Sequence, residues 1–387
     1  MERRPTVKIL QVVTLVAQGG AFGGPVSVAT AQCEELAQSD RQNSVEMWAG
    51  WDSMGEVDAG DARPVLFPTI RMVPGMGFSG LGAPRLWRAM MRRRADFDVI
   101  HVHMGRDLIS LIAATIAALG STRLVIQTHG MVEPDRRIRA RVLDPAVRFV
   151  LRRACAVLVL TAHESAAISS LTRGRANTVI VNNGVRIPPA RRFRAGDRLT
   201  FLFMARLHPR KRAAVFAHAA VDVHARSRGK TQFVIAGPDE GDLAEVQDIL
   251  SEHTEVSMRY VGALSAKQAQ LAMASADVYV LPSVGEVYPM TVVEALSQGI
   301  PTVITNDCGL AQDLKNRNAA IIIDENGGVQ ALADALLELA ADPGRLAELS
   351  TAGRAAAEEL FNIERIADGL ESVYAGSSTR NLASTDT

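Results

Sequence analysis

Short runs of Val, Ile and Leu alternate with Ala-rich segments along most of this chain, and this alternation limits the fold more than any other feature. Apolar runs of this length between turn signals are typical of strands buried on both faces of a parallel sheet. Strand, helix and strand repeated in this way predicts an α/β fold with helices on both faces of the sheet. The predicted strands are VKILQVVTL, DVIHVHM, RLVIQTH, AVLVLTA and TVIVNN, then LTFLFMA, TQFVIAG, MRYVG, DVYVLPS, PTVITN and AAIIID.

The length of the chain predicts two domains, because 387 residues exceed one core of ordinary size. The strand series begins afresh after Asn183, and the stretch 187–198 has no apolar periodicity, so the linker is placed there. We expect two doubly wound Rossmann-like domains facing a common cleft, since such sheets bind ligands outside the carboxyl ends of their strands. The predicted segments are domains 1–190 and 191–360, a helix over 361–376 and a disordered tail over 377–387.

Cysteine usage and hydropathy indicate a cytoplasmic protein. The three cysteines are Cys33, Cys155 and Cys308, an odd number without C-x-x-C spacing, which is typical of a reducing compartment. The apolar run near the N-terminus is interrupted by Lys8 and Gln11, so it is read as a buried first strand rather than a signal peptide. No apolar stretch approaches the roughly 20 residues of a membrane span.

The formal charge of zero conceals an asymmetry. Residues 1–192 contain 25 Lys and Arg against 16 Asp and Glu, a charge of +9, and the remainder carries −9. Within the basic half, Pro84–Arg94 places Leu86, Trp87 and Met90 opposite several arginines, so this segment is weighed as a membrane-surface contact against packing on its own domain. Nucleic acid is not an expected partner, because the basic segments lack interleaved aromatic residues.

Two glutamates in GEVYPMTVVEALSQG mark the first candidate site. Pro289 suits the first turn of a helix and Gly299 the position after its end, so Glu286 is placed in the preceding loop and Glu294 about two turns in. The amide groups of the first helical residues would face an anion. These N–H groups belong to Tyr288, Met290 and Thr291. Pro289 lies within the same stretch and has no N–H of its own.

A second anion signal is MARLHPRKR, where Arg206 and Lys211 follow the end of a strand. Arg offers a planar fork and Lys a point charge, so together they can neutralise a diphosphate. Cations beside carboxylates indicate a nucleotide sugar whose hydroxyls bond to Glu286 and Glu294. Since a nucleoside diphosphate is a weak base, such a site would act by stabilising charge.

In this order the motifs resemble retaining glycosyltransferases of family 4, which have the GT-B fold. The resemblance rests on the E-x7-E pair Glu286 and Glu294, and covers almost the whole chain. Its other pieces are GGAFGGPVSVA, DVIHVH, QTHG, VNNGV, ARLHPRK, ALSQGIP and a terminal helix that in this fold crosses back to the first domain.

The resemblance implies hexose transfer from a nucleotide diphosphate sugar of UDP or GDP type to a hydroxyl acceptor in polysaccharide or glycolipid synthesis, with no metal. It implies that Arg206 and Lys211 hold the diphosphate, that Glu294 holds the ribose and that Glu286 contacts the hexose. It also implies a place for His129 beside the hexose. Gly23 and Gly24 would lie near the phosphates or the acceptor, which could be a lipid-linked saccharide at the inner face of the membrane.

This chain departs from the family pattern in two loops. Ala205 and Arg212 stand where the family usually carries glycine, and 308–312 replaces the usual Gly-Gly-x-Pro-Glu. Two other functions therefore stay open: a sugar-nucleotide epimerase of the same architecture, or a binding protein with impaired turnover.

Three further patterns could imitate other sites. His101 and His103 share one strand face with no carboxylate at ligand spacing, so neutral packed histidines are expected there rather than a metal site. The D-x-D at 96–98 and the G-x-G-x-x-G at 75–80 lack the flanking structure that metal or dinucleotide binding needs.

Overall fold

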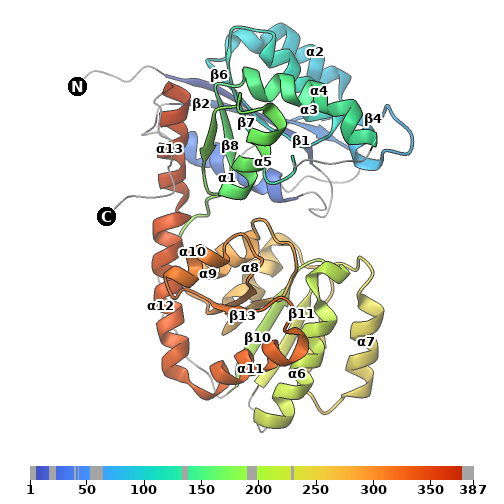
Figure 1. Cartoon of the computed structure of the whole chain (residues 1–387), viewed down its shortest axis with the longest axis vertical. Coiled ribbons are helices and arrows are strands. Elements are labelled where there is room, and N and C mark those ends of the chain that lie inside the picture. The colour runs from blue at the N-terminus through green and yellow to red at the C-terminus, as the bar shows by residue number, and fades with distance from the viewer. Residues whose placement is uncertain are drawn as a thin grey trace, which may run out of the picture. The chain divides into compact units, whose positions relative to one another are not determined.

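The computed structural model describes residues 6–16, 23–38, 41, 43–52, 64–132, 138–189, 198–227 and 231–376. It divides into two compact units, and each is considered by itself. Unit 1 comprises Met1–Gly184 with Ile363–Thr387, and unit 2 comprises Val185–Asn362. Each contains a main sheet of parallel strands covered by helices (Figure 1). The predicted α/β class with two Rossmann-like domains is confirmed, and the predicted disordered tail lies outside the described residues.

Unit 1 is built on a seven-stranded sheet in the order β3-β2-β1-β6-β7-β8-β9. Its strands are β1 Lys8–Val16, β2 Ser44–Trp51, β3 Val65–Pro68, β6 Val99–His103, β7 Arg123–Gln127, β8 Ala156–Val159 and β9 Thr178–Ile180, with β4 Ile70–Arg71 and β5 Leu81–Gly82 forming a separate antiparallel pair. Its helices are α1 Gly23–Leu36, α2 Pro84–Arg93, α3 Leu108–Ala118, α4 Ile138–Arg153, α5 Ala162–Thr172 and α13 Ile363–Ala375, with short 3-10 turns at Gly77–Gly80 and Arg94–Asp96.

Alternate side chains of β1 enter different cores. Leu10 and Val12 pack with residues of α2, α3 and α4, while Ile9 packs with α13 through residues such as Leu370. Because both faces of the sheet are covered, all five residues of β6 are buried. Strands of this kind read as continuous apolar runs, which is why they could be predicted from the sequence.

Unit 2 is built on a six-stranded sheet in the order β12-β11-β10-β13-β14-β15. Its strands are β10 Leu199–Met204, β11 Thr231–Ala236, β12 Met258–Tyr260, β13 Val278–Leu281, β14 Thr302–Thr305 and β15 Ile321–Ile323. Its helices are α6 Ala213–Ser227, α7 Leu243–Glu252, α8 Ala266–Ser275, α9 Met290–Ser297, α10 Ala311–Asn316, α11 Gly328–Ala341 and α12 Pro343–Leu360, with a 3-10 turn at Pro209–Lys211. The order reverses between β10 and β13, and this switch point is where such sheets bind ligands.

The sequence prediction missed β2 and β3 at one side of the first sheet. β2 carries Glu46 within an otherwise apolar run, which obscures the strand pattern. The carboxylate is accommodated because Arg93 NH2 donates to it at 2.8 Å and Trp48 Nε1 at 2.9 Å. These partners lie elsewhere in the fold or on the strand itself, so the tolerance of a charge there depends on tertiary contacts.

The apolar side of Pro84–Arg94 is not free for the membrane contact that the sequence suggested for this segment. Leu86, Trp87 and Met90 of α2 are buried in the core of unit 1, and Trp87 Nε1 donates to Ile109 O at 3.2 Å. Met91 is 58% exposed, and the arginines around it are exposed as well. The apolar side of α2 therefore cannot insert into a bilayer while the domain stays folded. Within the described residues, no helix has the length and hydropathy needed to cross a membrane.

Candidate functional site

The loop after β10 is shaped by its own hydrogen bonds. His208 accepts a hydrogen bond from Arg210 N at 3.1 Å through Nδ1, and Lys211 N donates to His208 O at 2.7 Å, which closes the turn at Pro209–Lys211. Arg212 follows with a φ of 60°, in the left-handed region that favours glycine. Its guanidinium donates to Glu325 O at 2.6 Å, which helps to hold a conformation that a non-glycine residue adopts reluctantly.

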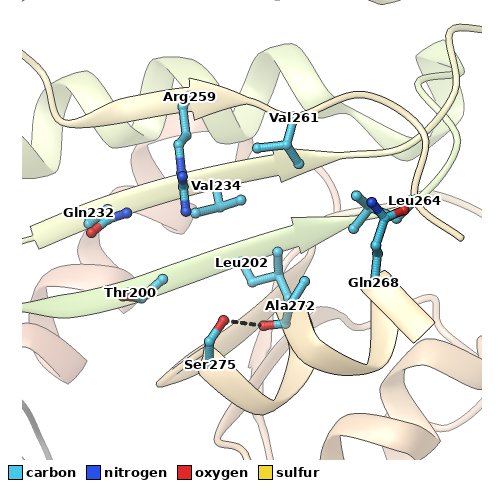
Figure 2. Close-up of a pocket in the computed structure, with 10 residues that line it drawn as sticks. All are labelled: Thr200, Leu202, Gln232, Val234, Arg259, Val261, Leu264, Gln268, Ala272 and Ser275. Carbon is cyan, nitrogen blue, oxygen red and sulfur yellow. Dashed lines mark hydrogen bonds between the residues drawn. The ribbon is translucent and has the colours of Figure 1, made fainter. Parts of the chain in front are cut away.

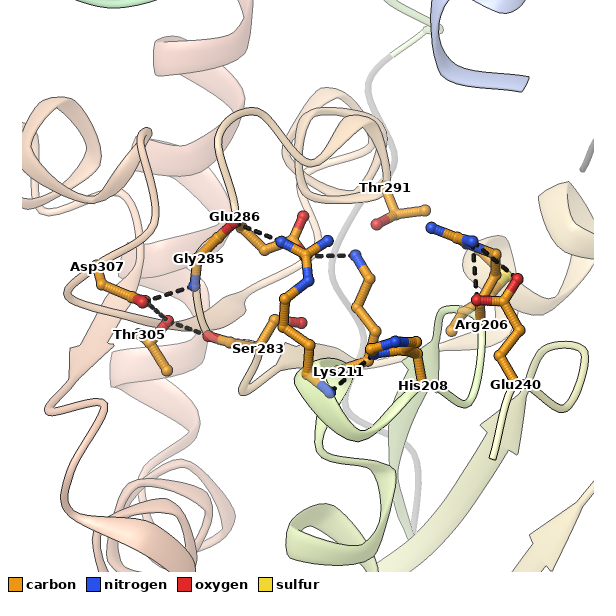
Figure 3. Close-up of polar contacts among 12 residues, drawn as sticks. Arg206, His208, Lys211, Glu240, Ser283, Gly285, Glu286, Thr291, Thr305 and Asp307 are labelled. Carbon is orange, nitrogen blue, oxygen red and sulfur yellow. Dashed lines mark hydrogen bonds and ion pairs between the residues drawn. The ribbon is translucent and has the colours of Figure 1, made fainter. Parts of the chain in front are cut away.

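Lys211 and Glu286 form the centre of the site in unit 2 (Figure 3). Lys211 Nζ donates to Glu286 Oε1, and Arg210 NH2 lies 3.7 Å from the same oxygen. Arg210 NH1 also donates to Gly285 O at 2.6 Å. The side chains of Lys211 and Glu286 are 13% and 9% exposed, so this ion pair is largely shielded from water. Two residues that the sequence assigned to different motifs are thus in direct contact.

The loop that carries Glu286 is supported from beneath by the segment after β14. Gly285 N donates to Asp307 Oδ2 at 2.6 Å, and Thr305 Oγ1 donates to Ser283 O at 2.6 Å. Gly309 N donates to Glu286 O at 2.7 Å. The stretch 308–312, where the chain departs from the family pattern, therefore still holds the backbone of Glu286.

Arg206 lies near this centre but has a carboxylate partner of its own. Its NH1 donates to both Glu240 Oε1 and Glu240 Oε2 at 2.8 Å (Figure 3). About half of the Arg206 side chain is exposed, so the pair is screened by water. Glu240 was not predicted, because nothing in the sequence indicates that it faces a residue 34 positions earlier.

Helix α9 begins one residue later than predicted. Pro289 is its N-cap and Met290 its first residue, so Glu294 lies just over one turn into the helix rather than two. Thr291 Oγ1 accepts a hydrogen bond of 2.6 Å from the buried Tyr279 hydroxyl. Glu294 is exposed by surface area, although the surrounding protein desolvates its carboxyl and raises the pKa to about 7. Tyr288 packs edge-on against Phe361 at a ring-centroid distance of 6.1 Å.

His129 belongs to unit 1, directly after β7, and has a φ of 51°. His103 Nδ1 lies 2.8 Å from its Nε2, and His103 Nε2 lies 2.9 Å from Gln11 Oε1. Burial lowers the pKa of His129 to about 3 and that of His103 well below the usual range, so both rings are neutral at pH 7. The interpretation of His101 and His103 as neutral packed histidines agrees with this geometry.

The backbone turn that presents His129 is fastened by a carboxylate that the sequence did not reveal. Glu164 of α5 is 1% exposed and accepts hydrogen bonds from Thr128 Oγ1 and Gly130 N at 2.6 Å each, and from Leu160 N at 2.8 Å. Gly23 and Gly24 are the first two residues of α1, and residues 17–22 before them lie outside the described part.

The other motifs have structural roles. Asp98 Oδ2 accepts a hydrogen bond from Lys8 N at 2.8 Å, and the residues described include no cluster of His, Cys, Asp or Glu that could hold a metal ion. The glycine-rich stretch 75–80 forms a turn and a 3-10 helix between β4 and β5, so it lacks the strand-to-helix context of dinucleotide binding.

Unit 2 also contains a cavity of about 360 Å³ on the face of its sheet beside α8 (Figure 2). None of the predicted donor residues lines it, so it is separate from the site around Lys211. Its lining residues are Thr200, Leu202, Gln232, Val234, Arg259, Val261, Leu264, Gln268, Ala272 and Ser275.

Comparison with known proteins identifies the two halves of the chain. Residues 189–356 match the family described as glycosyl transferases group 1, and residues 14–184 match the glycosyl transferase 4-like domain. Together these matches cover the strands of both main sheets except for most of β1.

Among curated proteins, the GDP-mannose-dependent alpha-(1-6)-phosphatidylinositol monomannoside mannosyltransferase of Mycobacterium tuberculosis is 25% identical over 333 residues. That match covers 79% of this chain and 82% of the relative. The phosphatidyl-myo-inositol mannosyltransferase of Mycobacterium leprae is 27% identical over 290 residues, covering 73% of this chain and 74% of that protein.

Among solved structures, Anabaena HepE in complex with UDP and glucose matches with a TM-score of 0.69 at 18% identity. The match covers 94% of this chain and 99% of HepE, and it supports the GT-B fold. The family assignment decides against the epimerase and the binding protein. With both halves matched, the chain belongs to the group 1 glycosyltransferases of family 4, and it is a retaining hexosyltransferase of GT-B fold that uses a nucleotide sugar.

Proposed function

We propose that the donor is a nucleoside diphosphate hexose, with GDP-mannose as the first candidate, and that the acceptor is a hydroxyl of an inositol-containing lipid. The donor candidate rests on the name of the mycobacterial relative, which matches over most of both chains. The observation that carries the chemistry is the cluster in which Lys211 and Arg210 face Glu286 within one unit. Cations beside a shielded carboxylate suit a ligand with a diphosphate next to sugar hydroxyls.

In this proposal the protein acts mainly by stabilising charge. Lys211, Arg206 and the N-terminus of α9 neutralise the diphosphate as the bond between the anomeric carbon and the phosphate oxygen breaks. The acceptor oxygen bonds to the same face of that carbon, and its proton passes to the departing phosphate. Charge neutralisation by these cations requires no metal ion.

The remaining predicted residues position the two ends of the donor. Glu294 accepts hydrogen bonds from the ribose hydroxyls, and Glu286 and His129 contact the hexose. Tyr288 and the N-cap Pro289 precede α9, Met290 and Thr291 begin it, and these four residues would lie beside the phosphates. Gly23 and Gly24 begin α1, where backbone amide groups can approach a phosphate or the acceptor without a side chain between them.

We further propose a cytoplasmic protein that acts at the membrane surface, because an inositol lipid acceptor would reside there. Arg85, Arg88 and Arg92 on the exposed side of α2 supply positive charge for anionic headgroups. Such a contact would depend on charge rather than on insertion, since the apolar side of α2 is buried.

The test is calorimetric titration of the wild type and of the Arg206→Ala/Lys211→Ala variant with GDP, UDP and ADP. We expect GDP to bind and the double variant to lose about a hundredfold or more in affinity and in hexose transfer from GDP-mannose to phosphatidylinositol. Arg226→Ala is the matched control, because Arg226 is 53% exposed and pairs with Asp334 elsewhere in unit 2. Binding of UDP and not GDP would mean that the donor is a UDP-sugar rather than GDP-mannose. Unchanged turnover in the double variant would disprove the assignment of Arg206 and Lys211 to the diphosphate.

A further inference from the structure

A continuous line of polar contacts lies buried in the core of unit 1 and ends at His129. Gln11 of β1 and His103 of β6 are 0% and 1% exposed. Gln11 presents its carbonyl Oε1 to His103 Nε2 at 2.9 Å, and His103 presents Nδ1 to His129 Nε2 at 2.8 Å. The His103 and His129 rings lie nearly parallel, with an interplanar angle of 15° and centroids 5.0 Å apart.

With the Gln11 amide oriented as it is here, its oxygen toward His103, these contacts allow only one arrangement of protons in neutral rings. The Gln11 oxygen can only accept, so His103 must carry its proton on Nε2 and donate it to Gln11. His103 Nδ1 is then an acceptor, which requires His129 to carry its proton on Nε2. His129 Nδ1 is left as the acceptor nitrogen of that ring. Burial keeps both rings neutral at pH 7, so a second proton does not blur this assignment.

We propose that Gln11 and His103 are positioning residues that fix the tautomer of His129, so that His129 offers Nδ1 as a hydrogen-bond acceptor to a hydroxyl of the transferred sugar. This inference rests on the proposed role of His129 at the hexose. The other tautomer would offer an N–H to the same hydroxyl. That N–H would donate to the hydroxyl oxygen, and the hydroxyl proton would then lack the Nδ1 acceptor. The amide of a residue on β1 thus decides the polarity of a group beyond the end of β7.

The backbone of His129 shows that this side chain is held in place from two directions. Its φ of 51° is unusual for a residue with a side chain, and such conformations persist where the surroundings fix them. Glu164 binds the amide of Gly130 and the hydroxyl of Thr128 on either side of it, at 2.6 Å each. The ring and the backbone of His129 are therefore constrained independently.

The first test measures the tautomer and needs no substrate. Long-range proton–nitrogen NMR of the ¹⁵N-histidine-labelled full chain distinguishes a protonated from an unprotonated ring nitrogen, and the His129→Asn variant assigns the signals. We expect Nε2 to be protonated in both His103 and His129. A wild-type signal that places the proton of His129 on Nδ1 overturns the proposal, whatever the donor turns out to be.

The second test uses the pair Gln11→Met and Gln32→Met. Both glutamines are 0% exposed, but Gln32 of α1 donates to Gln127 Oε1 at 3.1 Å and has no contact with the histidines among its described hydrogen bonds. We expect Gln11→Met to shift the His129 nitrogen signals toward a mixture of tautomers and to lower kcat about tenfold or more, with donor KM within about twofold. We expect Gln32→Met to retain the wild-type signals and kcat.

Each outcome of the second test decides the question. Equal kcat losses in the two variants would mean that a buried glutamine matters only for folding. Unchanged His129 signals in Gln11→Met would mean that Gln11 does not set the tautomer. Failure of GDP and UDP to bind the wild type would instead disprove the proposed function and leave the tautomer result standing. If Gln11→Met does not fold, the wild-type tautomer measurement still decides the proposal.

Discussion

Arg206 and Glu240 form a two-pronged ion pair in unit 2, in which one guanidinium nitrogen lies 2.8 Å from both carboxylate oxygens. A diphosphate that uses Arg206 must compete with this carboxylate. Glu240→Ala is therefore expected to increase the affinity for GDP or for the nucleotide that binds, by about two- to fivefold, because an exposed pair contributes up to ~1 kcal/mol. Calorimetric titration measures the change.

A matched variant separates this effect from a general loss of negative charge. Asp334→Ala removes the partner of Arg226, a pair with a 3.0 Å contact and a similar exposed fraction elsewhere in unit 2. Its nucleotide affinity should equal that of the wild type. Equal gains in both variants would show that long-range charge, rather than release of Arg206, is responsible.

The pair Lys211 and Glu286 is shielded, so it should contribute to stability as well as to function. Lys211→Met leaves the Glu286 carboxylate without its nearest cation and is expected to destabilise unit 2 by about 2–4 kcal/mol. Lys211→Met/Glu286→Gln should recover at least half of that loss, because no buried charge is left unpaired. Transfer activity should remain about a hundredfold or more below the wild type in both variants.

Urea unfolding followed by far-UV circular dichroism measures the stability of these variants, and a hexose-transfer assay measures their activity. The prediction is that stability recovers in the double variant and activity does not. Recovery of activity along with stability in the double variant would mean that Lys211 has only a structural role. No recovery of stability would mean that the cost of Lys211→Met arises from something other than the unpaired carboxylate of Glu286.

The sequence was sufficient for those features that depend on local pattern. The strands of the two sheets that are covered on both faces could be found from their apolar runs, and the helix of Glu294 from Pro289 and Gly299. Contact partners could not be found in this way. Glu240 meets Arg206 only because two loops after neighbouring strands meet, and no spacing rule predicts the contact.

The same limit explains two other surprises in the structure. Glu46 hides a strand because its charge is balanced by Arg93, which is 47 residues away in the chain. Glu164 fastens the turn at His129 from a helix 34 residues downstream of Gly130. A buried carboxylate is tolerated where residues distant in the sequence donate hydrogen bonds to it, so its position becomes evident only when the fold is known.

Glu294 should make donor binding depend on pH near neutrality. Its carboxyl has a pKa raised to about 7 by desolvation, and only the ionised form accepts hydrogen bonds with both oxygens. Affinity for the nucleotide sugar should therefore fall by roughly tenfold between pH 8 and pH 6. This experiment should use a nucleotide sugar rather than a free nucleoside diphosphate, because the esterified diphosphate of the sugar does not titrate between pH 6 and pH 8.

Two variants examine this dependence on pH. Glu294→Gln should bind more weakly at pH 8 and show no pH dependence from 6 to 8. Glu252→Gln, which changes an exposed carboxylate on α7, should keep the wild-type dependence. A wild-type affinity that stays constant across the range, or one that rises as the pH falls, would contradict the role of Glu294 as an ionised acceptor.

Glu164 should be the most costly polar residue to remove near His129. Glu164→Ala removes the acceptor of two amide groups and the nearer of two acceptors of the Thr128 hydroxyl, so we expect a loss of about 3 kcal/mol or more in the stability of unit 1. All three tryptophans, Trp48, Trp51 and Trp87, lie in this unit, so tryptophan fluorescence follows its unfolding alone.

Ser165→Ala provides the comparison on the same helix. It removes a single hydroxyl contact with Thr178, at 2.8 Å, and should cost only about 1 kcal/mol. If the two variants unfold at the same urea concentration, Glu164 does not fasten the turn. If Glu164→Ala folds, its transfer rate should fall much more than that of Ser165→Ala, because the turn that carries His129 loses its anchor.

Gly237 packs against the backbone of Ala205, the residue that precedes Arg206. It has a φ of 143°, and a Cβ atom at this position would lie 1.8 Å from the backbone oxygen of Ala205. Neither segment can yield easily, because Gly237 N donates to Gly262 O at 2.9 Å and Ala205 N donates to Ala236 O at 3.1 Å. Gly237→Ala should therefore displace Ala205 and Arg206, destabilise unit 2 by about 3 kcal/mol and weaken nucleotide binding.

Gly262→Ala distinguishes this clash from simple backbone strain. Gly262 has a φ of 77°, but an added Cβ would meet nothing within 4 Å, so the variant carries only the conformational cost of about 1–2 kcal/mol. Urea unfolding and titration with the nucleotide that binds measure both variants. Equal stabilities and equal affinities would mean that contact with Ala205 is unimportant. A selective loss of affinity in Gly237→Ala would show that close packing of two strand ends sets the position of Arg206.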